Sequence, residues 1–232
     1  MFHIGLENGT EGRSQAWVLG HPGCFAYGID GEAALEAVPG AIQDYRKWIE
    51  AHTSKSWLDE ADLEHLEYRL DETWECYSID PDYELTQDGY EVNAWFRHDW
   101  KPLGMQDIQR GQTLLEWGQE ELLKTLNDLD THTLERTYPK ERWSISGILK
   151  HMGGAEWWYL DRLGLAFPRQ DVPDEPFQRY EKVRTHLVSI LPGLIASTKV
   201  VGVGGEFWSP RKLLRRAVWH EYDHIAHIKK LL

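Results

Sequence analysis

The sequence predicts an α+β protein in which a small α+β domain, residues 1–103, precedes a four-helix bundle, residues 104–232. Two patterns support this fold class. Apolar residues occur in short, glycine-punctuated runs through the first hundred residues, which is typical of strands. From Met105 onward they recur every three or four residues, which is typical of amphipathic helices. A length of 232 residues with 41% hydrophobic content suits one or two globular domains.

The first domain is predicted to contain several short strands and one helix. Apolar residues between Ala34 and Ile49 recur at helical spacing, and Pro39-Gly40 indicates a kink or break within that helix. Glycine and proline residues separate the strands from their neighbours. The predicted strands cover residues 2–6, 16–19, 23–28, part of 66–79 and 90–96.

The second half is predicted to form four helices that bury their apolar faces together as a bundle. The last helix has the clearest start, because Ser209 can cap its first amides and Pro210 suits the first helical position. Residues 200–207, which include three glycines, are predicted to form a long connection before it. The four helices are predicted at residues 105–129, 144–163, about 176–191 and 210–232.

Charge is distributed unevenly along the chain, whose formal net charge is −13. Residues 1–103 carry 21 Asp or Glu against 7 Lys or Arg, whereas residues 104–232 carry 17 against 18. An acidic surface repels phosphate groups, so we expect no nucleic-acid partner. The absence of a long apolar run argues against a membrane partner, and the first residues do not resemble a signal peptide, so a cytoplasmic location is expected. Cys24 and Cys76 are expected to be free thiols there.

Three histidines near the end of the chain suggest a metal site. His220, His224 and His227 lie at positions i, i+4 and i+7 of the last predicted helix, so they share one helix face. Neutral imidazole is a common ligand of zinc and related ions, and an i, i+4 pair offers two nitrogens to one ion. His151, from the second helix of the bundle, is the best candidate for a further ligand. Weaker candidates are His132 and His186.

Two segments of the second half resemble a known family. Residues 143–158 contain Trp-Ser-Ile-Ser-Gly-Ile-Leu-Lys-His and Glu-Trp-Trp, and residues 208–224 begin Trp-Ser-Pro-Arg-Lys-Leu-Leu-Arg-Arg and end His-Glu-Tyr-Asp-His. They are similar to the DinB/YfiT-like superfamily, a resemblance that covers about residues 104–232. It implies a four-helix bundle in which a divalent metal is held by His151, His220 and His224. It also implies low-molecular-weight thiols as substrates, because characterised relatives include thiol-dependent transferases and isomerases.

The first domain carries a second resemblance. Residues 24–48, in which Cys-Phe-Ala-Tyr-Gly runs into the helical Glu-Ala-Ala-Leu-Glu-Ala, are similar to the small α+β domain of HicB-like antitoxins. The resemblance implies a fold for residues 1–103. It includes no chemical motif, so it implies nothing about activity.

Three imidazoles would leave one coordination position of a zinc-like ion open for substrate or water. The sequence therefore predicts a metal-dependent enzyme that activates a thiol or water against a small electrophilic substrate, as a thiol transferase, isomerase or hydrolase. Zinc, nickel and iron all suit three imidazoles, so the divalent ion is not identified. The expected partners are a small-molecule thiol and an electrophile, and such bundles often pair as homodimers.

Several roles near the site stay open. Glu156 and Glu221 are candidates for accepting the second N–H of a ligating imidazole, and with His227 they are candidate catalytic residues. His220 to His224 also fits the H-E-x-x-H signature of zinc proteases, but only eight residues follow His224, too few for the usual downstream ligand. A non-enzymatic metal-binding or protein-interaction module is the remaining alternative.

Overall fold

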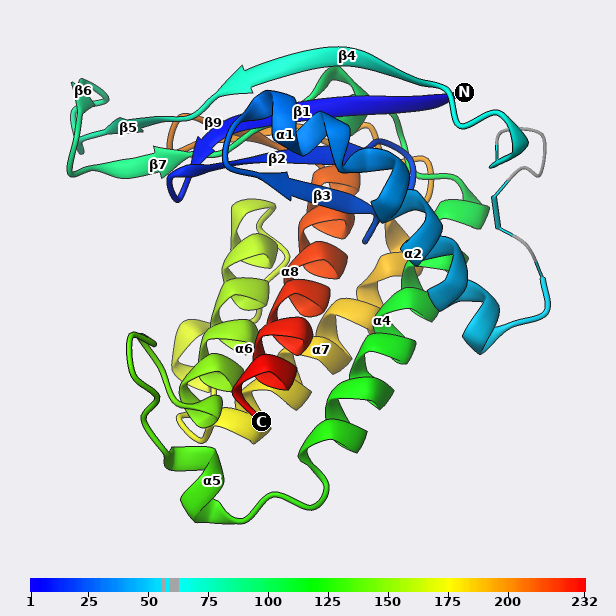
Figure 1. Ribbon diagram of the computed structural model, residues 1–232. Coiled ribbons are helices and arrows are strands. Elements are labelled where there is room, and N and C mark those ends of the chain that lie inside the picture. Colours follow the sequence, from blue (N-terminus) through cyan, green and yellow to red (C-terminus); the bar gives the residue numbers. More distant parts are fainter. Residues whose placement is uncertain (56, 59–62) are drawn as a thin grey trace. The chain divides into compact units, whose positions relative to one another are not determined.

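The computed structural model describes residues 1–55, 57–58 and 63–232 and divides the chain into two compact units (Figure 1). The strand-rich unit contains residues 1–101 and 202–208. The helical unit contains residues 102–201 and 209–232. The predicted α+β fold class is confirmed. Residues 202–208 belong to the strand-rich unit, although they follow most of the helical unit in sequence.

The main sheet of the strand-rich unit has the order β3-β2-β1-β4. Strand β1 pairs antiparallel with β2 and parallel with β4, with Ile4 opposite both Val18 and Leu70. The apolar residues Phe2, Ile4 and Leu6 of β1 are buried and occupy alternate positions, as expected for a strand. The strands are β1 (Phe2–Thr10), β2 (Arg13–Val18), β3 (Phe25–Gly28) and β4 (Tyr68–Glu75).

Two helices follow β3 in the same unit. Helix α1 (Gly31–Glu36) begins where the Asp30 side chain accepts a hydrogen bond from the Ala33 amide, 2.9 Å away. One residue, Ala37, separates α1 from helix α2 (Val38–His52), which has Pro39 in its first turn. The predicted break near Pro39 is therefore observed.

A second, smaller sheet completes the unit. Its order is β6-β5-β7, and it is followed by the short 3₁₀ helix η1 (Arg97–Trp100). The predicted strand region 66–79 therefore contains two strands that lie in different sheets. The strands of the smaller sheet are β5 (Tyr77–Ile79), β6 (Leu85–Thr86) and β7 (Tyr90–Val92).

Residues 201–208 form a hairpin rather than the predicted connection. Strands β8 (Val201–Val203) and β9 (Glu206–Trp208) pair across Gly204-Gly205, whose φ angles of 60° and 78° suit glycine. Glu206 is buried and accepts hydrogen bonds from the Tyr90 hydroxyl at 2.6 Å and the Asn93 amide at 3.1 Å. A segment that lies between two helices of the helical unit in sequence therefore contributes a buried carboxylate to the strand-rich unit.

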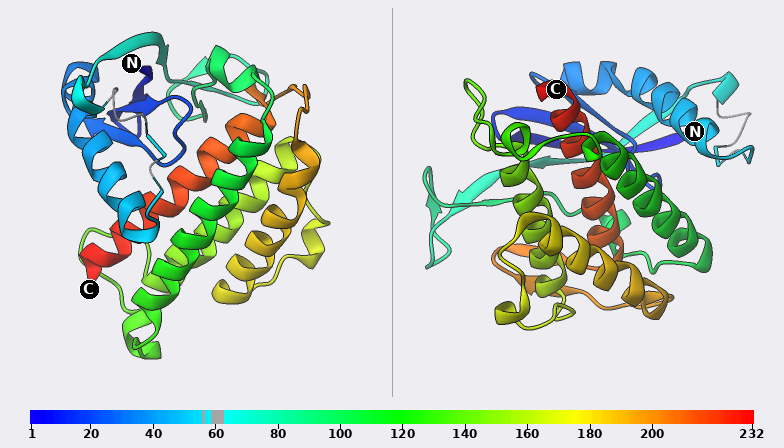
Figure 2. Two further views of the ribbon diagram at one scale, coloured as in Figure 1. Left: turned by 90° about the vertical axis from the view of Figure 1, so that its right-hand side faces the viewer. Right: turned by 90° about the horizontal axis from the view of Figure 1, so that it is seen from below.

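Four long helices run side by side in the helical unit (Figures 1 and 2). Ser144 caps α6 and Ser209 caps α8, and Pro210 occupies the first position of α8 as predicted. No helix in the described part of the chain is both long and apolar enough to span a membrane. The helices are α4 (Met105–Leu126), α5 (Thr131–Glu135), α6 (Ile145–Arg162), η2 (Arg169–Asp171), α7 (Pro176–Ile190), η3 (Leu191–Leu194) and α8 (Pro210–Leu231).

Gly153 allows α6 to pack closely against α7. A Cβ atom at this position would lie 2.9 Å from both the amide nitrogen and the Cα of Tyr180. At the neighbouring Gly154, a Cβ would meet only Arg179 Nη1, at 3.9 Å.

We expect Gly153→Ala to lower the free energy of unfolding by about 1–3 kcal/mol, because α6 and α7 must move apart to make room for the added methyl group. Gly154→Ala should be neutral or stabilising by up to ~1 kcal/mol. Urea denaturation measures both; equal effects would contradict this role of Gly153.

Candidate metal centre

Helices α6 and α8 together carry the three predicted metal ligands. His151 lies in α6, and His220 and His224 lie one turn apart on α8. Ser144 and Ser209 cap the first turns of α6 and α8 and so set where the two helices begin. The helical repeat from those starts then determines which face of its helix each histidine occupies. The structure brings the three imidazoles together as the only such cluster of potential metal ligands among the residues described.

The Nε2 atoms of the three rings converge. Nε2 of His220 lies 3.0 Å from Nε2 of His151 and 3.0 Å from Nε2 of His224. A tetrahedral ion with metal–nitrogen distances of about 2.0–2.1 Å separates its ligands by roughly 3.3 Å. The two 3.0 Å separations are within a few tenths of an ångström of that value, and all three ligand atoms lie within 4.8 Å of one another, as one small divalent ion requires. The donor set fits the metal that the sequence predicts.

The surroundings keep all three imidazoles neutral. Burial lowers the pKa of His224 to about 3 and lowers the pKa of His220 well below its ordinary value, and neighbouring imidazoles add smaller contributions in the same direction at both residues. Burial also lowers the pKa of His151, with a smaller contribution from the charge of Arg142. A neutral imidazole has a lone pair available for a metal ion, so the site needs no deprotonation step at neutral pH.

Aromatic rings hold two of the imidazoles in place. The Trp143 ring stacks on His151, with centroids 4.5 Å apart and an interplanar angle of 22°. Tyr159 presents its edge to His220, with centroids 5.9 Å apart. Such contacts restrict ring rotation and so favour a preformed set of nitrogen ligands.

Glu156 and Glu221 bind Arg184 rather than an imidazole N–H. Arg184 Nη2 lies 2.5 Å from one oxygen of each carboxylate, and Arg184 Nη1 donates to the Leu115 carbonyl at 3.2 Å. The second oxygen of Glu221 accepts a hydrogen bond from the Tyr180 hydroxyl at 2.7 Å. This Arg184 network is buried and includes groups from α4, α6, α7 and α8. Arg184 was not among the residues predicted from the sequence to have a role.

The other candidate histidines lie apart from the three-imidazole cluster. His227 Nε2 lies 2.9 Å from Glu141 Oε2, and the His227 ring centroid is 6.3 Å from that of His224. His132 is exposed in α5, and His186 Nε2 lies 2.8 Å from the Leu165 carbonyl. These positions favour polar packing for His227 over metal binding.

Both cysteines are free, and their surroundings make them poor nucleophiles. Burial raises the pKa of Cys24 far above its ordinary value. Burial and the nearby Glu7 carboxylate raise the pKa of Cys76 to about 12. Because the thiolate is the reactive form, thiol chemistry in this protein would require a thiol from outside the chain.

Comparison with known protein families identifies a match within the helical unit. Residues 114–228 match the DinB superfamily. The match includes His151, His220 and His224 and most of the four long helices, so the helical unit is DinB-like. It does not include residues 1–113, and the predicted HicB-like fold of the first domain stays a prediction. No curated protein and no solved structure matches the chain.

Proposed function

We propose that the DinB-like unit is a metal-dependent enzyme that promotes attack of a small-molecule thiol, or of water, on a small electrophilic substrate. The observation that carries the proposal is the convergence of three neutral imidazoles, one buried and two partly buried, in which the His220 Nε2 atom lies 3.0 Å from the Nε2 atoms of both His151 and His224. A divalent ion held by three imidazoles keeps a coordination position open and lowers the pKa of a thiol or water bound there.

The roles of the chain's own residues follow from their positions. His151, His220 and His224 would hold the ion, while Trp143 and Tyr159 keep the first two imidazole rings in orientation. The external thiol would supply the nucleophile, because neither cysteine of the chain is reactive.

A zinc-protease mechanism is disfavoured by the position of Glu221. In that mechanism the glutamate of H-E-x-x-H acts as the general base on a metal-bound water. Here both carboxylate oxygens of Glu221 are occupied, one by Arg184 and the other by Tyr180, and the side chain is 2% exposed. A carboxylate held in this way is a structural counter-ion rather than a free base.

The test begins with metal content. Protein purified without an immobilised-metal column is titrated with zinc, nickel and iron(II), together with His151→Ala and His220→Ala. His132→Ala is the matched control, because it removes an exposed imidazole from the same unit. We expect one ion per chain for the wild type and the control and at least a 100-fold loss of affinity in the two site variants. Wild-type protein without stoichiometric metal would overturn the metal centre.

Activity is tested separately with the metal-loaded protein. A panel of small thiols is assayed against a chromogenic aryl halide, and water is assayed against activated esters. We expect turnover that disappears in His220→Ala and persists in His132→Ala. Stoichiometric metal binding with no turnover in either assay would contradict the enzyme proposal and favour a non-enzymatic metal-binding module.

A further inference from the structure

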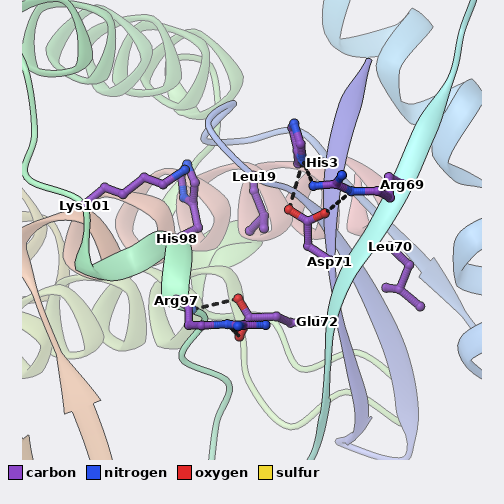
Figure 3. A pocket seen from close by; sticks show the side chains of 9 residues that line it. All are labelled: His3, Leu19, Arg69, Leu70, Asp71, Glu72, Arg97, His98 and Lys101. Carbon is purple, nitrogen blue, oxygen red and sulfur yellow. Dashed lines mark hydrogen bonds and ion pairs between the residues drawn. The ribbon is translucent and has the colours of Figure 1, made fainter.

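A pocket of about 500 Å³ lies in the strand-rich unit, apart from the residues of the metal centre (Figure 3). It is formed by β1, by Leu19 directly after β2, by β4 and by the segment around η1. Its size is within the range of pockets that take small organic molecules. Because Arg69, Arg97 and Lys101 line it, we call it the basic pocket.

The basic pocket concentrates positive charge in an acidic part of the chain. Residues 1–103 contain 7 Lys or Arg against 21 Asp or Glu, and Arg69, Arg97 and Lys101 all line this one pocket. His3 and His98 line it as well. The carboxylates Asp71 and Glu72 also line it, so three cations against two carboxylates leave a formal charge of +1 on the pocket lining. A positive lining within an acidic segment favours a negatively charged ligand.

Two carboxylates of the pocket lining pair with the arginines and hold them in position. Asp71 bridges Arg69 Nε at 2.8 Å and His3 Nδ1 at 2.9 Å, and Glu72 accepts a hydrogen bond from the Arg97 amide at 2.9 Å (Figure 3). Burial works to raise the pKa of Asp71, but the hydrogen bonds from Arg69 and His3 outweigh it, so this pKa is below its ordinary value. The carboxylate therefore stays ionised and keeps Arg69 oriented.

The guanidinium groups retain donors for a ligand. Glu72 contacts Arg97 through Nε, 3.4 Å away, and Asp71 likewise uses Nε of Arg69. Arg69 Nη2 also lies 3.4 Å from His3 Nδ1. The other N–H groups on the Nη atoms of the two guanidinium groups suit bidentate binding of an oxyanion. The side chains of Arg69 and Arg97 are 62% and 77% exposed, so a ligand can reach them from solvent.

The pocket also has an apolar part. Leu19 is buried beneath it, and Leu70 on β4 is 41% exposed at its edge. Leucine side chains offer contact to a hydrocarbon or aromatic body rather than to a second charge. The potential metal ligands described in the chain converge only at the three imidazoles of the helical unit, so the basic pocket is not a second metal site.

We propose that the basic pocket binds a small organic anion, with Arg69 and Arg97 as the donors to its carboxylate or phosphate group and with the leucines of the lining as the apolar surface that its body contacts. This proposal does not depend on the metal centre, since every residue of the pocket belongs to the strand-rich unit.

Calorimetric titration of the full chain with benzoate and with phenyl phosphate, at low ionic strength, tests the proposal. The two probes share an aromatic body and differ in their anionic group. We expect saturable binding of at least one of them, and the tighter probe identifies the preferred head group. The double variant Arg69→Gln/Arg97→Gln should weaken this binding at least tenfold.

Arg46→Gln is the matched control, because Arg46 is an exposed arginine on α2 of the same unit, paired with Glu50. It removes the same kind of charge outside the pocket, and its affinity should stay within twofold of the wild type. Circular dichroism of the variants verifies that they are folded. Absence of saturable binding of both probes, or equal weakening by Arg46→Gln and the double variant, would overturn the proposal.

Discussion

Replacing Arg184 by methionine is expected to lower the free energy of unfolding by about 3–5 kcal/mol. Arg184 is 2% exposed and binds Glu156 and Glu221, which are equally buried. Its removal would leave two carboxylates in the interior without a counter-ion, and an uncompensated buried charge is one of the costliest defects a fold can contain. Urea denaturation of the metal-free protein at pH 7.5 measures the loss.

A matched variant separates the charge effect from lost packing. Arg184→Met combined with Glu156→Gln and Glu221→Gln removes the cation and both carboxylate charges, while the amide side chains keep nearly the same volume. We expect this triple variant to recover at least half of the stability lost by Arg184→Met. If the single variant loses less than ~1 kcal/mol, or the triple variant is no more stable than the single one, the charge balance of the network does not stabilise the bundle.

The Arg184 network shows where helical periodicity stops being informative. Tyr180, Val183, Arg184 and Leu187 are all buried positions of α7, so a charged residue stands within an apolar face. That interruption was the available signal for a buried ion pair. Its partners could not be read from the sequence, because Glu156 and Glu221 are on two other helices and meet Arg184 only after the helices pack.

The three converging imidazoles were predictable for the opposite reason. His220 and His224 are one turn apart on one helix, so their common face follows from helix geometry alone. His151 was the best candidate for the further ligand before any family was considered, and the resemblance to a known family then implied the same residue. Spacing within one helix alone does not reveal which residue of another helix faces it. Glu156 and Glu221 were candidates for accepting hydrogen bonds from the imidazoles, because carboxylates are common partners of ligating histidines. In the structure both carboxylates accept hydrogen bonds from Arg184 instead.

The hairpin of residues 201–208 was also missed, although its turn was visible. Gly204-Gly205 stands between Val201-Gly202-Val203 and Glu206-Phe207-Trp208, and two glycines between short β-favouring segments are typical of a tight hairpin turn. Strands of three residues are too short to show alternation. The contacts that stabilise them, from Tyr90 and Asn93 to Glu206, join segments more than a hundred residues apart.

Acidification is expected to destabilise the metal-free protein between pH 7.5 and pH 5.0, with His224 contributing about 2 kcal/mol of the loss. In the unfolded chain this imidazole takes up a proton near pH 6.5. In the folded protein its pKa is about 3, because burial disfavours the charged form. The unfolded state therefore binds more protons throughout this range. The contribution of His224 is complete above about pH 6.5 and is lost progressively as the pH falls toward 3.

Denaturation with urea at the two pH values, in the presence of a chelator, measures this loss. His224→Gln removes the titrating group. Between pH 7.5 and pH 5.0, the free energy of unfolding of this variant should therefore decrease by about 2 kcal/mol less than that of the wild type. His132→Gln, at an exposed position of α5, should keep the wild-type dependence. This range lies above the region in which ordinary Asp and Glu side chains titrate, so the difference between variants reports on imidazole. A parallel loss in the wild type and His224→Gln would mean that the folded protein protonates His224 readily. The imidazole would then lack the neutral, buried environment on which the metal centre depends.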